Sequence, residues 1–283
     1  MSQFFHFLNM TFPQNFRADL NAIAREAGTF LLAERQKFSL DAVEYKGLND
    51  LVSYVDKECE RMLVPKLRAL LPKAGFITEE GTTEQADKSG GMPPGLNWII
   101  DPLDGTTNFI HGLPIFAVSI GLTQGNRPIA GVVYDPNRDE CFSALDGQGA
   151  WLGAGGGDEQ SIRVSGAKKL ADGLIATGFP YYRFEKMQPY LQILEQLMQR
   201  THGLRRMGSA AIDLAYVASG RFEGFFESNL KSWDMAAGIC LVREAGGTVT
   251  DFEGGDSALF GGDIVAGCAL HSELLGLIGE HWT

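Results

Sequence analysis

Residues 98–108 read Trp98-Ile-Ile-Asp101-Pro-Leu-Asp104-Gly-Thr-Thr-Asn108. A short apolar run ends in one carboxylate, and a tight turn then leads to a second. The Gly-Thr-Thr that follows opens backbone whose N–H groups can face an anion. Magnesium prefers one or two carboxylates together with phosphate oxygens. The stretch therefore predicts a site for a divalent cation that carries a phosphate ester.

Two further acids lie in similar settings. Glu79, Asp101 and Asp104 are each expected at or just past the end of a strand, which is where ligands gather in layered α/β folds. Asp234 begins a predicted helix, so its carboxylate would be presented at the N-terminus of that helix. Singly, each acid is explained as a turn or a helix cap. Together they would repel one another unless divalent cations balance them, so the set favours a metal centre.

The composition describes a globular protein that acts on a small molecule. The chain has 283 residues, 45% hydrophobic and 21% charged, and a net charge of −11. This charge argues against nucleic acid or an anionic membrane surface as the main partner. No apolar run approaches the ~18 residues of a membrane span. The four cysteines form no Cys-x-x-Cys pair, which suits reduced thiols, so we expect a cytoplasmic protein.

Apolar periodicity and turn residues predict a mixed α/β chain. Helices are expected over 15–38 and 54–71, the second broken or bent near Pro65. Strands are expected over 75–79, 115–123, 128–134 and 140–145, and beyond residue 157 strands and helices alternate, which favours helices layered against a sheet. Residues 147–157 contain six glycines and mark the expected boundary. We expect an N-terminal α+β domain, residues 1–153, with the metal motif, and a C-terminal α/β domain, residues 154–283, that completes the site.

Three segments carry a resemblance to a known family. They are Glu79-Glu80, the stretch 98–109, and Trp233-Asp-Met-Ala-Ala-Gly238 followed by Glu244-Ala-Gly-Gly247. Together they resemble the inositol monophosphatase family, and the likeness runs from about residue 16 to the C-terminus. Upstream, residues 46–56 are similar to the family's lysine loop and catalytic-base segment.

The resemblance implies a fold and an activity. The fold is a layered αβαβα sandwich, shared with fructose-1,6-bisphosphatase, and the protein is a homodimer. The activity is hydrolysis of a small-molecule phosphate ester, myo-inositol monophosphate, to inositol and phosphate, which is an inositol-1-monophosphatase activity. It depends on two to three Mg²⁺ ions, with Mn²⁺ as a substitute, and is sensitive to lithium.

The resemblance also assigns metal ligands. A first ion falls to Glu79, Asp101 and the main-chain oxygen of Leu103. A second falls to Asp101, Asp104 and Asp234, so that Asp101 bridges the two. A third, more weakly held, lies near Glu79 through water.

The same resemblance gives roles in catalysis. Thr106 and Asp56 form the pair that orients and deprotonates the attacking water. Glu80 is an acid beside the ligands, and Lys46 and Asp50 belong to a mobile loop near the metals. Phosphoryl transfer asks little covalent work of a protein, so positioning and charge neutralisation should dominate.

Substrate contacts are assigned in the same way. Backbone N–H groups of Gly105 and Thr106 fix the phosphate, and Gly105 lets the backbone come close. Gly208-Ser209-Ala210 lies against the ring hydroxyls, and Glu227 binds them by hydrogen bonds. From the residues alone, Gly208-Ser209 is a helix start and Glu227 a charge at a strand end.

Three alternatives stay open. An aspartyl-phosphate phosphatase has a similar Asp-x-Asp-Gly-Thr motif, but Pro102 and Leu103 separate the acids here, which disfavours it. Related branches act on fructose bisphosphate, histidinol phosphate or nucleotide 3'-phosphates. Asn108, which follows Gly-Thr-Thr, is similar to the residue of the inositol branch, because the nucleotide branch tends to carry Arg-Glu at this point. The last alternative is a binding or regulatory protein that keeps the fold without turnover.

Overall fold

The computed structural model describes residues 12–37, 43–47, 50–85, 95–155, 157–179 and 184–282, with the backbone alone for 43–47 and 50–53. Its helices are α1 (Phe16–Lys37), α2 (Tyr54–Leu70), α3 (Thr106–His111), α4 (Met187–Arg200), α5 (Ala210–Ala218), α6 (Ser232–Glu244), α7 (Ala258–Gly261) and α8 (His271–His281), with a 3₁₀ turn, η2 (Leu170–Asp172). Its strands are β1 (Val43–Gly47), β2 (Asp50–Ser53), β3 (Gly75–Thr78), β4 (Leu96–Asp104), β5 (Ala117–Gln124), β6 (Arg127–Asp135), β7 (Glu140–Leu145), β8 (Ala150–Ala154), β9 (Gln160–Ile162), β10 (Leu174–Thr177), β11 (Gly203–Arg205), β12 (Gly224–Glu227), β13 (Thr248–Thr250) and β14 (Ile264–Gly267).

The strands form two large sheets and a small hairpin. The seven-stranded sheet has the order β3-β4-β5-β6-β7-β8-β9. Its first pair is parallel and the other pairs are antiparallel. The five-stranded sheet has the order β11-β10-β12-β14-β13, and β1 pairs only with β2 in the described residues.

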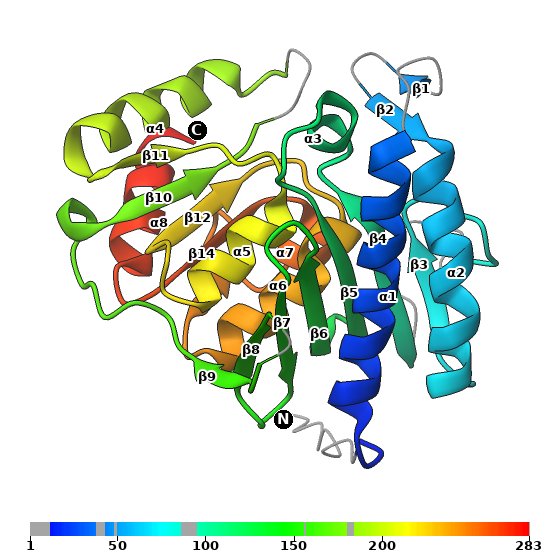
Figure 1. Ribbon diagram of the computed structural model, residues 1–283. Helices are drawn as coiled ribbons and strands as arrows, with labels where there is room; N and C mark the ends of the chain where they lie inside the picture. Colours follow the sequence, from blue (N-terminus) through cyan, green and yellow to red (C-terminus); the bar gives the residue numbers. More distant parts are fainter. Residues whose placement is uncertain are drawn as a thin grey trace, which may run out of the picture.

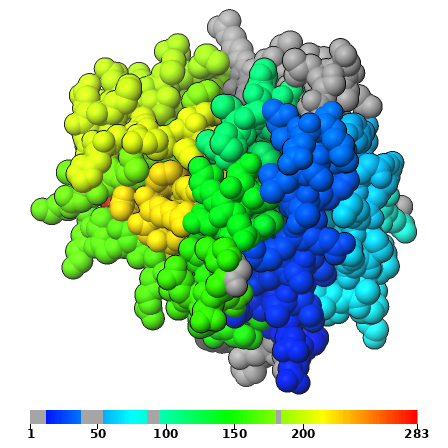
Figure 2. Space-filling model, in the orientation of Figure 1, coloured from blue at the N-terminus to red at the C-terminus, as the bar shows by residue number. Residues whose placement is uncertain are grey.

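Helices cover both sheets in alternating layers (Figure 1). α1 and α2 pack on one face of the seven-stranded sheet. α5 and α6 lie between the two sheets, and α4 and α8 cover the far side of the five-stranded sheet. This arrangement is the expected αβαβα sandwich. In the space-filling view the blue atoms of α1 and the yellow-green atoms around α4 lie on opposite sides of the molecule (Figure 2).

Residue patterns explain these layers. α1 buries one stripe, including Leu20, Ala24, Ala27 and Leu31, as expected of a helix with one face on a sheet. α6 is instead buried on nearly all sides, because sheets lie on both of its faces. It also lies close to the seven-stranded sheet, since a side chain at Gly131 would approach the backbone oxygen of Ala237 to 2.6 Å. This tight contact fixes α6, and with it Asp234 in its first turn.

The structure corrects two expectations. α2 runs through Pro65 without a break, because this residue lies on the exposed side, where water can satisfy the carbonyl that proline leaves without a donor. Asp101 lies inside β4 rather than at its end. The glycine-rich stretch, residues 147–157, contains β8, which pairs with β7. The domain division between residues 153 and 154 stays a prediction; β9 adds a further strand to the sheet beyond it.

Candidate metal centre and phosphate site

Three carboxylates from distant parts of the chain meet in space. Asp101 and Asp104 come from β4 and Asp234 from the first turn of α6. Each offers an oxygen, and these oxygens all lie within 4.8 Å of one another. Among the described residues, no other group of three or more His, Cys, Asp or Glu side chains could hold an ion in this way.

A local irregularity in β4 brings the first two acids together. Residues three apart on a regular strand point to opposite faces of the sheet. The pairing of β4 with β5 shifts register between Asp101 and Asp104, and such a shift re-aims side chains. The N–H of Leu103 donates to Oδ1 of Asp101 at 2.9 Å, which holds this turn. We infer that the shift lets both carboxylates share one site.

Asp104 is held from the other half of the chain. Its Oδ2 accepts hydrogen bonds from Oγ of Ser209 at 2.6 Å and from the N–H of Ala211 at 2.7 Å. Ser209 is the residue that caps α5, and its Oγ also lies 3.3 Å from the N–H of Ile212. The expected contact of Ser209 with a substrate hydroxyl stays a prediction. Its observed contact is with a candidate metal ligand.

The remaining two acids are also fixed at element ends. Asp234 closes a capping box at the start of α6, where its Oδ2 accepts from the N–H of Lys231 at 2.7 Å. Glu79 directly follows β3, and its N–H donates to the carbonyl of Ile100 at 3.2 Å, next to Asp101. Glu79 is close enough to Asp101 to raise the pKa of that acid.

The predicted Thr106–Asp56 pair is formed. Oγ1 of Thr106 lies 3.0 Å from Oδ1 of Asp56, in the first turn of α2, and 3.1 Å from the carbonyl oxygen of Leu103. Thr106 begins α3, and Gly105 before it has φ 98°. A side chain at Gly105 would also approach the backbone oxygen of Ile115 to 2.9 Å, so both conformation and space require glycine there.

The carboxylates are crowded and withdrawn from water. Burial raises the pKa of Asp101 well above its ordinary value, and the charges of Glu79, Asp104 and Asp234 raise it further. Burial raises the pKa of Asp104 to about 6, against the hydrogen bonds from Ser209 and Ala211, which lower it. Burial and then Asp104 raise the pKa of Asp234 to about 8. A bound divalent cation would reverse this balance, and an all-oxygen ligand set suits Mg²⁺ or Mn²⁺.

Residues that are expected to contact the substrate lie near these carboxylates. Glu227 ends β12; burial raises its pKa to about 8, Arg206 lowers it, and the charge of Asp104 raises it. Nδ2 of Asn108 lies 2.8 Å from the carbonyl oxygen of Ile115 and 2.9 Å from that of Met207. It thereby ties the segment before Gly208 to the acidic motif.

The model of the inositol monophosphatase family matches residues 13–283. The chain belongs to the inositol monophosphatase family. It is 44% identical over 225 residues to "Inositol-1-monophosphatase" of Rhizobium meliloti (strain 1021), covering 80% of this chain and 81% of that protein.

Two further relatives of the chain carry another name. The chain is 47% identical over 247 residues to "Nus factor SuhB" of Escherichia coli (strain K12), covering 86% of this chain and 88% of that protein. The crystal structure of the extragenic suppressor protein suhB from Bartonella henselae matches with a TM-score of 0.83 at 40% identity, covering 94% and 98% of the two chains.

The sequence does not reveal the role of Asn108. It marks this residue only as typical of the inositol branch, yet in the structure its amide joins two segments of the site. Lys46 lies in β1 and Asp50 opens β2, but their side chains lie outside the described residues, so their loop role stays a prediction. None of the described helices of this family member has the length and apolar character needed to cross a membrane.

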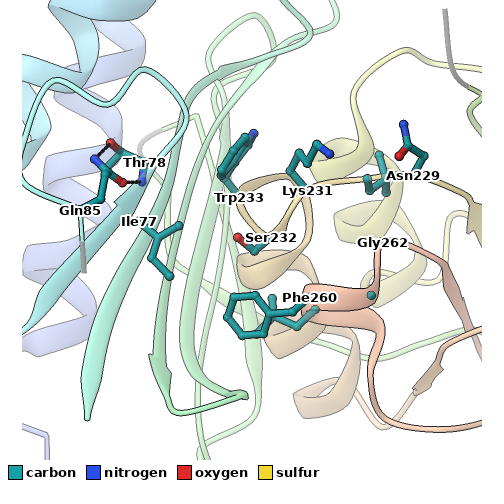
Figure 3. Close-up of a pocket in the computed structure, with 12 residues that line it drawn as sticks. Ile77, Thr78, Gln85, Asn229, Lys231, Ser232, Trp233, Phe260 and Gly262 are labelled. Atoms are coloured by element: carbon teal, nitrogen blue, oxygen red, sulfur yellow. Dashed lines mark hydrogen bonds between the residues drawn. The ribbon is translucent and has the colours of Figure 1, made fainter. Parts of the chain in front are cut away.

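A cavity of about 480 Å³ lies beside the segments that carry two of the acids (Figure 3). Thr78 and Gln85 line one wall, and Lys231 and Trp233 line the other. Thr78 directly precedes Glu79, and Trp233 directly precedes Asp234. The candidate metal centre therefore has open space next to the segments that carry Glu79 and Asp234.

The metal-free protein should lose thermal stability as the pH rises toward 8. Asp234 and Glu227 have folded-state pKa values of about 8, whereas carboxyls of an unfolded chain titrate near ~4. Between these values the folded state holds protons that the unfolded state has released, so raising the pH favours unfolding.

Thermal melts in EDTA at several pH values check this expectation, with Mg²⁺ as the control. Bound Mg²⁺ should raise Tm most at high pH, because metal binding requires ionised carboxylates. A Tm in EDTA that is flat or rises over this window would contradict the stated pKa directions.

Proposed function

We propose that the protein is a Mg²⁺-dependent phosphatase that hydrolyses myo-inositol monophosphates to inositol and phosphate. One observation carries the proposal. The same turn of chain supplies Asp101 and Asp104 to a three-carboxylate cluster and Thr106 to a hydrogen bond with Asp56. A cation site and a group that can activate water thus lie within a few residues of each other. The name of the Rhizobium meliloti relative supports inositol 1-phosphate as a substrate.

The donor set would suit two to three ions. Glu79, Asp101 and the carbonyl oxygen of Leu103 would hold the first. Asp101, Asp104 and Asp234 would hold the second, with a third ion near Glu79. When bound, the ions would supply the positive charge that neutralises the phosphate and makes water a better nucleophile. Glu80, next to Glu79, would add negative charge beside them.

The protein's own groups then orient the reactants. The Thr106 hydroxyl donates to Asp56, so its oxygen can accept a hydrogen bond from the attacking water. A proton leaving that water has a path through Thr106 to the carboxylate of Asp56. The N–H groups of Gly105 and Thr106 lie at the N-terminus of α3. Phosphate oxygens bind to the free N–H groups at helix N-termini.

Polyol recognition rests on the C-terminal half. Glu227 and Gly208-Ser209-Ala210 would contact the ring hydroxyls, with Glu227 as acceptor. Related branches of the family use fructose bisphosphate, histidinol phosphate or nucleotide 3'-phosphates. Measuring kcat/KM over a panel of these esters distinguishes them from the proposed activity. If one of these substrates exceeds inositol phosphates tenfold, which is about 1.4 kcal/mol of transition-state binding, the inositol assignment is wrong.

Removal of Mg²⁺ is expected to abolish phosphate release from inositol 1-phosphate. EDTA would strip the ions that the carboxylates hold, and excess Mg²⁺ or Mn²⁺ should restore turnover. Phosphate release is measured in EDTA and again after Mg²⁺ or Mn²⁺ is added back. Inhibition by lithium is measured in the same assay. Turnover that persists in EDTA contradicts the metal requirement, and no turnover on any polyol phosphate favours a binding or regulatory protein of the same fold.

Relatives named Nus factor SuhB give a second candidate, a role as a Nus factor. The observation in its favour is 47% identity over 86% of this chain. From the net charge of −11 we still expect no direct binding to nucleic acid or membrane. Mobility-shift titrations with RNA and DNA measure this, and a shift at physiological salt contradicts the expectation.

The assembly and location that the family suggests are proposals too. We propose a homodimer in the cytoplasm, and sedimentation measures the dimer directly. Buried, unpaired thiols at Cys59, Cys141, Cys240 and Cys268 support a reducing compartment.

A further inference from the structure

Glu60 is a buried acid in α2 to which the sequence drew no attention. Its side chain is fully enclosed, with 0% exposure. Oε1 accepts hydrogen bonds from Oγ1 of Thr78 at 2.8 Å and from both the N–H and Oγ1 of Thr82 at 2.7 Å. Oε2 accepts from the N–H of Glu80 at 2.8 Å. Four hydrogen-bond donors thus converge on this one carboxyl group.

All of these donors belong to one short loop. Residues 78–85, which we term the acidic loop, contain Glu79 and Glu80. Gln85 closes the loop, because its Oε1 accepts from the N–H of Thr78 at 2.8 Å and its Nε2 donates to Oγ1 of Thr78 at 3.0 Å (Figure 3). Nε2 of Gln85 also lies 2.9 Å from the carbonyl oxygen of Thr83. Glu60 lies beneath this closed loop and accepts hydrogen bonds from Thr78, Glu80 and Thr82.

Glu60 therefore fixes the backbone on both sides of Glu79. It binds the side chain of the preceding residue, Thr78, and the N–H of the following residue, Glu80. One helical turn before it, Asp56 accepts from Thr106. Residues four apart lie on the same face of a helix. One face of α2 thus holds both the acidic loop and the Thr106 hydroxyl.

We propose that Glu60 is a positioning residue that sets Glu79 and Glu80 for divalent-cation binding. The inference rests on the proposed function, because it takes Glu79 as a ligand. Residues that hydrogen-bond to metal ligands tune the affinity for the metal ion, and their loss typically costs ~10–100-fold in metal binding or activity. A residue that served folding alone would lower the melting temperature and leave metal affinity unchanged.

The principal variant is Glu60→Gln. It keeps the shape, but in either orientation its amide NH₂ faces a backbone N–H, of Glu80 or of Thr82, that the carboxylate now accepts. Thr82→Val is a milder variant, since it removes one hydroxyl donor, and Thr82→Ser restores that hydroxyl. The matched control is Leu67→Ala, a fully buried residue two turns further along α2, which should destabilise the helix without touching the acidic loop.

Mn²⁺ titrated calorimetrically into the metal-free full-length protein is the readout, with melting temperatures measured in parallel. We expect Glu60→Gln to weaken Mn²⁺ binding by ~10–100-fold, Thr82→Val to weaken it less, and Thr82→Ser and Leu67→Ala to bind like the wild type. In activity assays, Glu60→Gln should need more Mg²⁺ for half-maximal rate, while KM for the ester at saturating Mg²⁺ stays near the wild-type value.

The outcomes separate the two claims. Wild-type Mn²⁺ affinity in Glu60→Gln overturns the inference and leaves the proposed function intact. An equal loss of affinity in Leu67→Ala also overturns it, because the effect would then follow stability. No Mn²⁺ binding by the wild type overturns the proposed function and the inference with it. If Glu60→Gln does not fold, Thr82→Val compared with Thr82→Ser decides, and equal affinities overturn the inference.

Discussion

Asp101→Asn is expected to lower kcat/KM for inositol 1-phosphate by about 10³-fold or more, the largest loss from any one residue of the site. Asp101 is the only acid in both proposed ion sites. Metal ions supply several kcal/mol of transition-state stabilisation, and each ~1.4 kcal/mol is tenfold in rate. Asparagine keeps the shape and can still accept from the N–H of Leu103. Phosphate release at saturating Mg²⁺ measures the loss.

Two controls separate charge from folding in this variant. Thr107→Ala changes a neighbour of the same motif with no assigned role, and kcat/KM should stay near the wild-type value. The melting temperature of metal-free Asp101→Asn should rise, because burial and the neighbouring acids oppose ionisation of the Asp101 carboxyl, and asparagine has no charge to lose. If Asp101→Asn keeps more than about one tenth of the wild-type kcat/KM, a loss of under ~1.4 kcal/mol, Asp101 does not bridge the ions.

Thr106→Val is expected to lower kcat by about 10²–10⁴-fold, the range of a positioned acid–base group, with little change in KM. Valine has nearly the same shape but cannot donate to Asp56, so the water would lose both its orientation and its path for the proton. A loss in kcat alone indicates an interaction made in the transition state. Steady-state kinetics at saturating Mg²⁺ give both constants.

Thr106→Ser provides the matched control, since it restores the hydroxyl and should recover most of the rate. Asp56→Asn should reproduce the loss, and the double variant should add little, because the two residues act as a unit. An additive double variant, or a KM effect as large as the kcat effect, contradicts the pairing.

The sequence predicted elements where local patterns decide structure. β7 has the predicted bounds, and α1, α2 and β6 end within one residue of theirs, because apolar periodicity and turn residues act within a few residues. The glycine-rich stretch, residues 147–157, was expected to mark the domain boundary, and glycine is disfavoured in strands. Pairing with β7 nevertheless makes part of it a strand, β8. Tertiary context there overrides local preference.

The site shows the same division between local and distant causes. Asp101, Asp104 and Thr106 lie in one short motif, so their common site could be predicted. Contacts between distant residues could not be predicted. One example is the hydrogen bond of Ser209 to Asp104, which lie 105 residues apart. Glu60 had no motif to mark it, because its partners include backbone N–H groups about 20 residues away. The one local signal is its spacing of four residues from Asp56, which puts the two acids on the same face of a helix.

The central claim is that acids from distant segments hold divalent ions around one phosphate ester. Anomalous diffraction from crystals soaked in Mn²⁺ tests it most directly. We predict Mn²⁺ peaks bonded to Glu79, Asp101, Asp104 and Asp234, with Asp101 shared between two ions. A map with these carboxylates apart, or together and without Mn²⁺ between them at a concentration that supports turnover, would contradict the account.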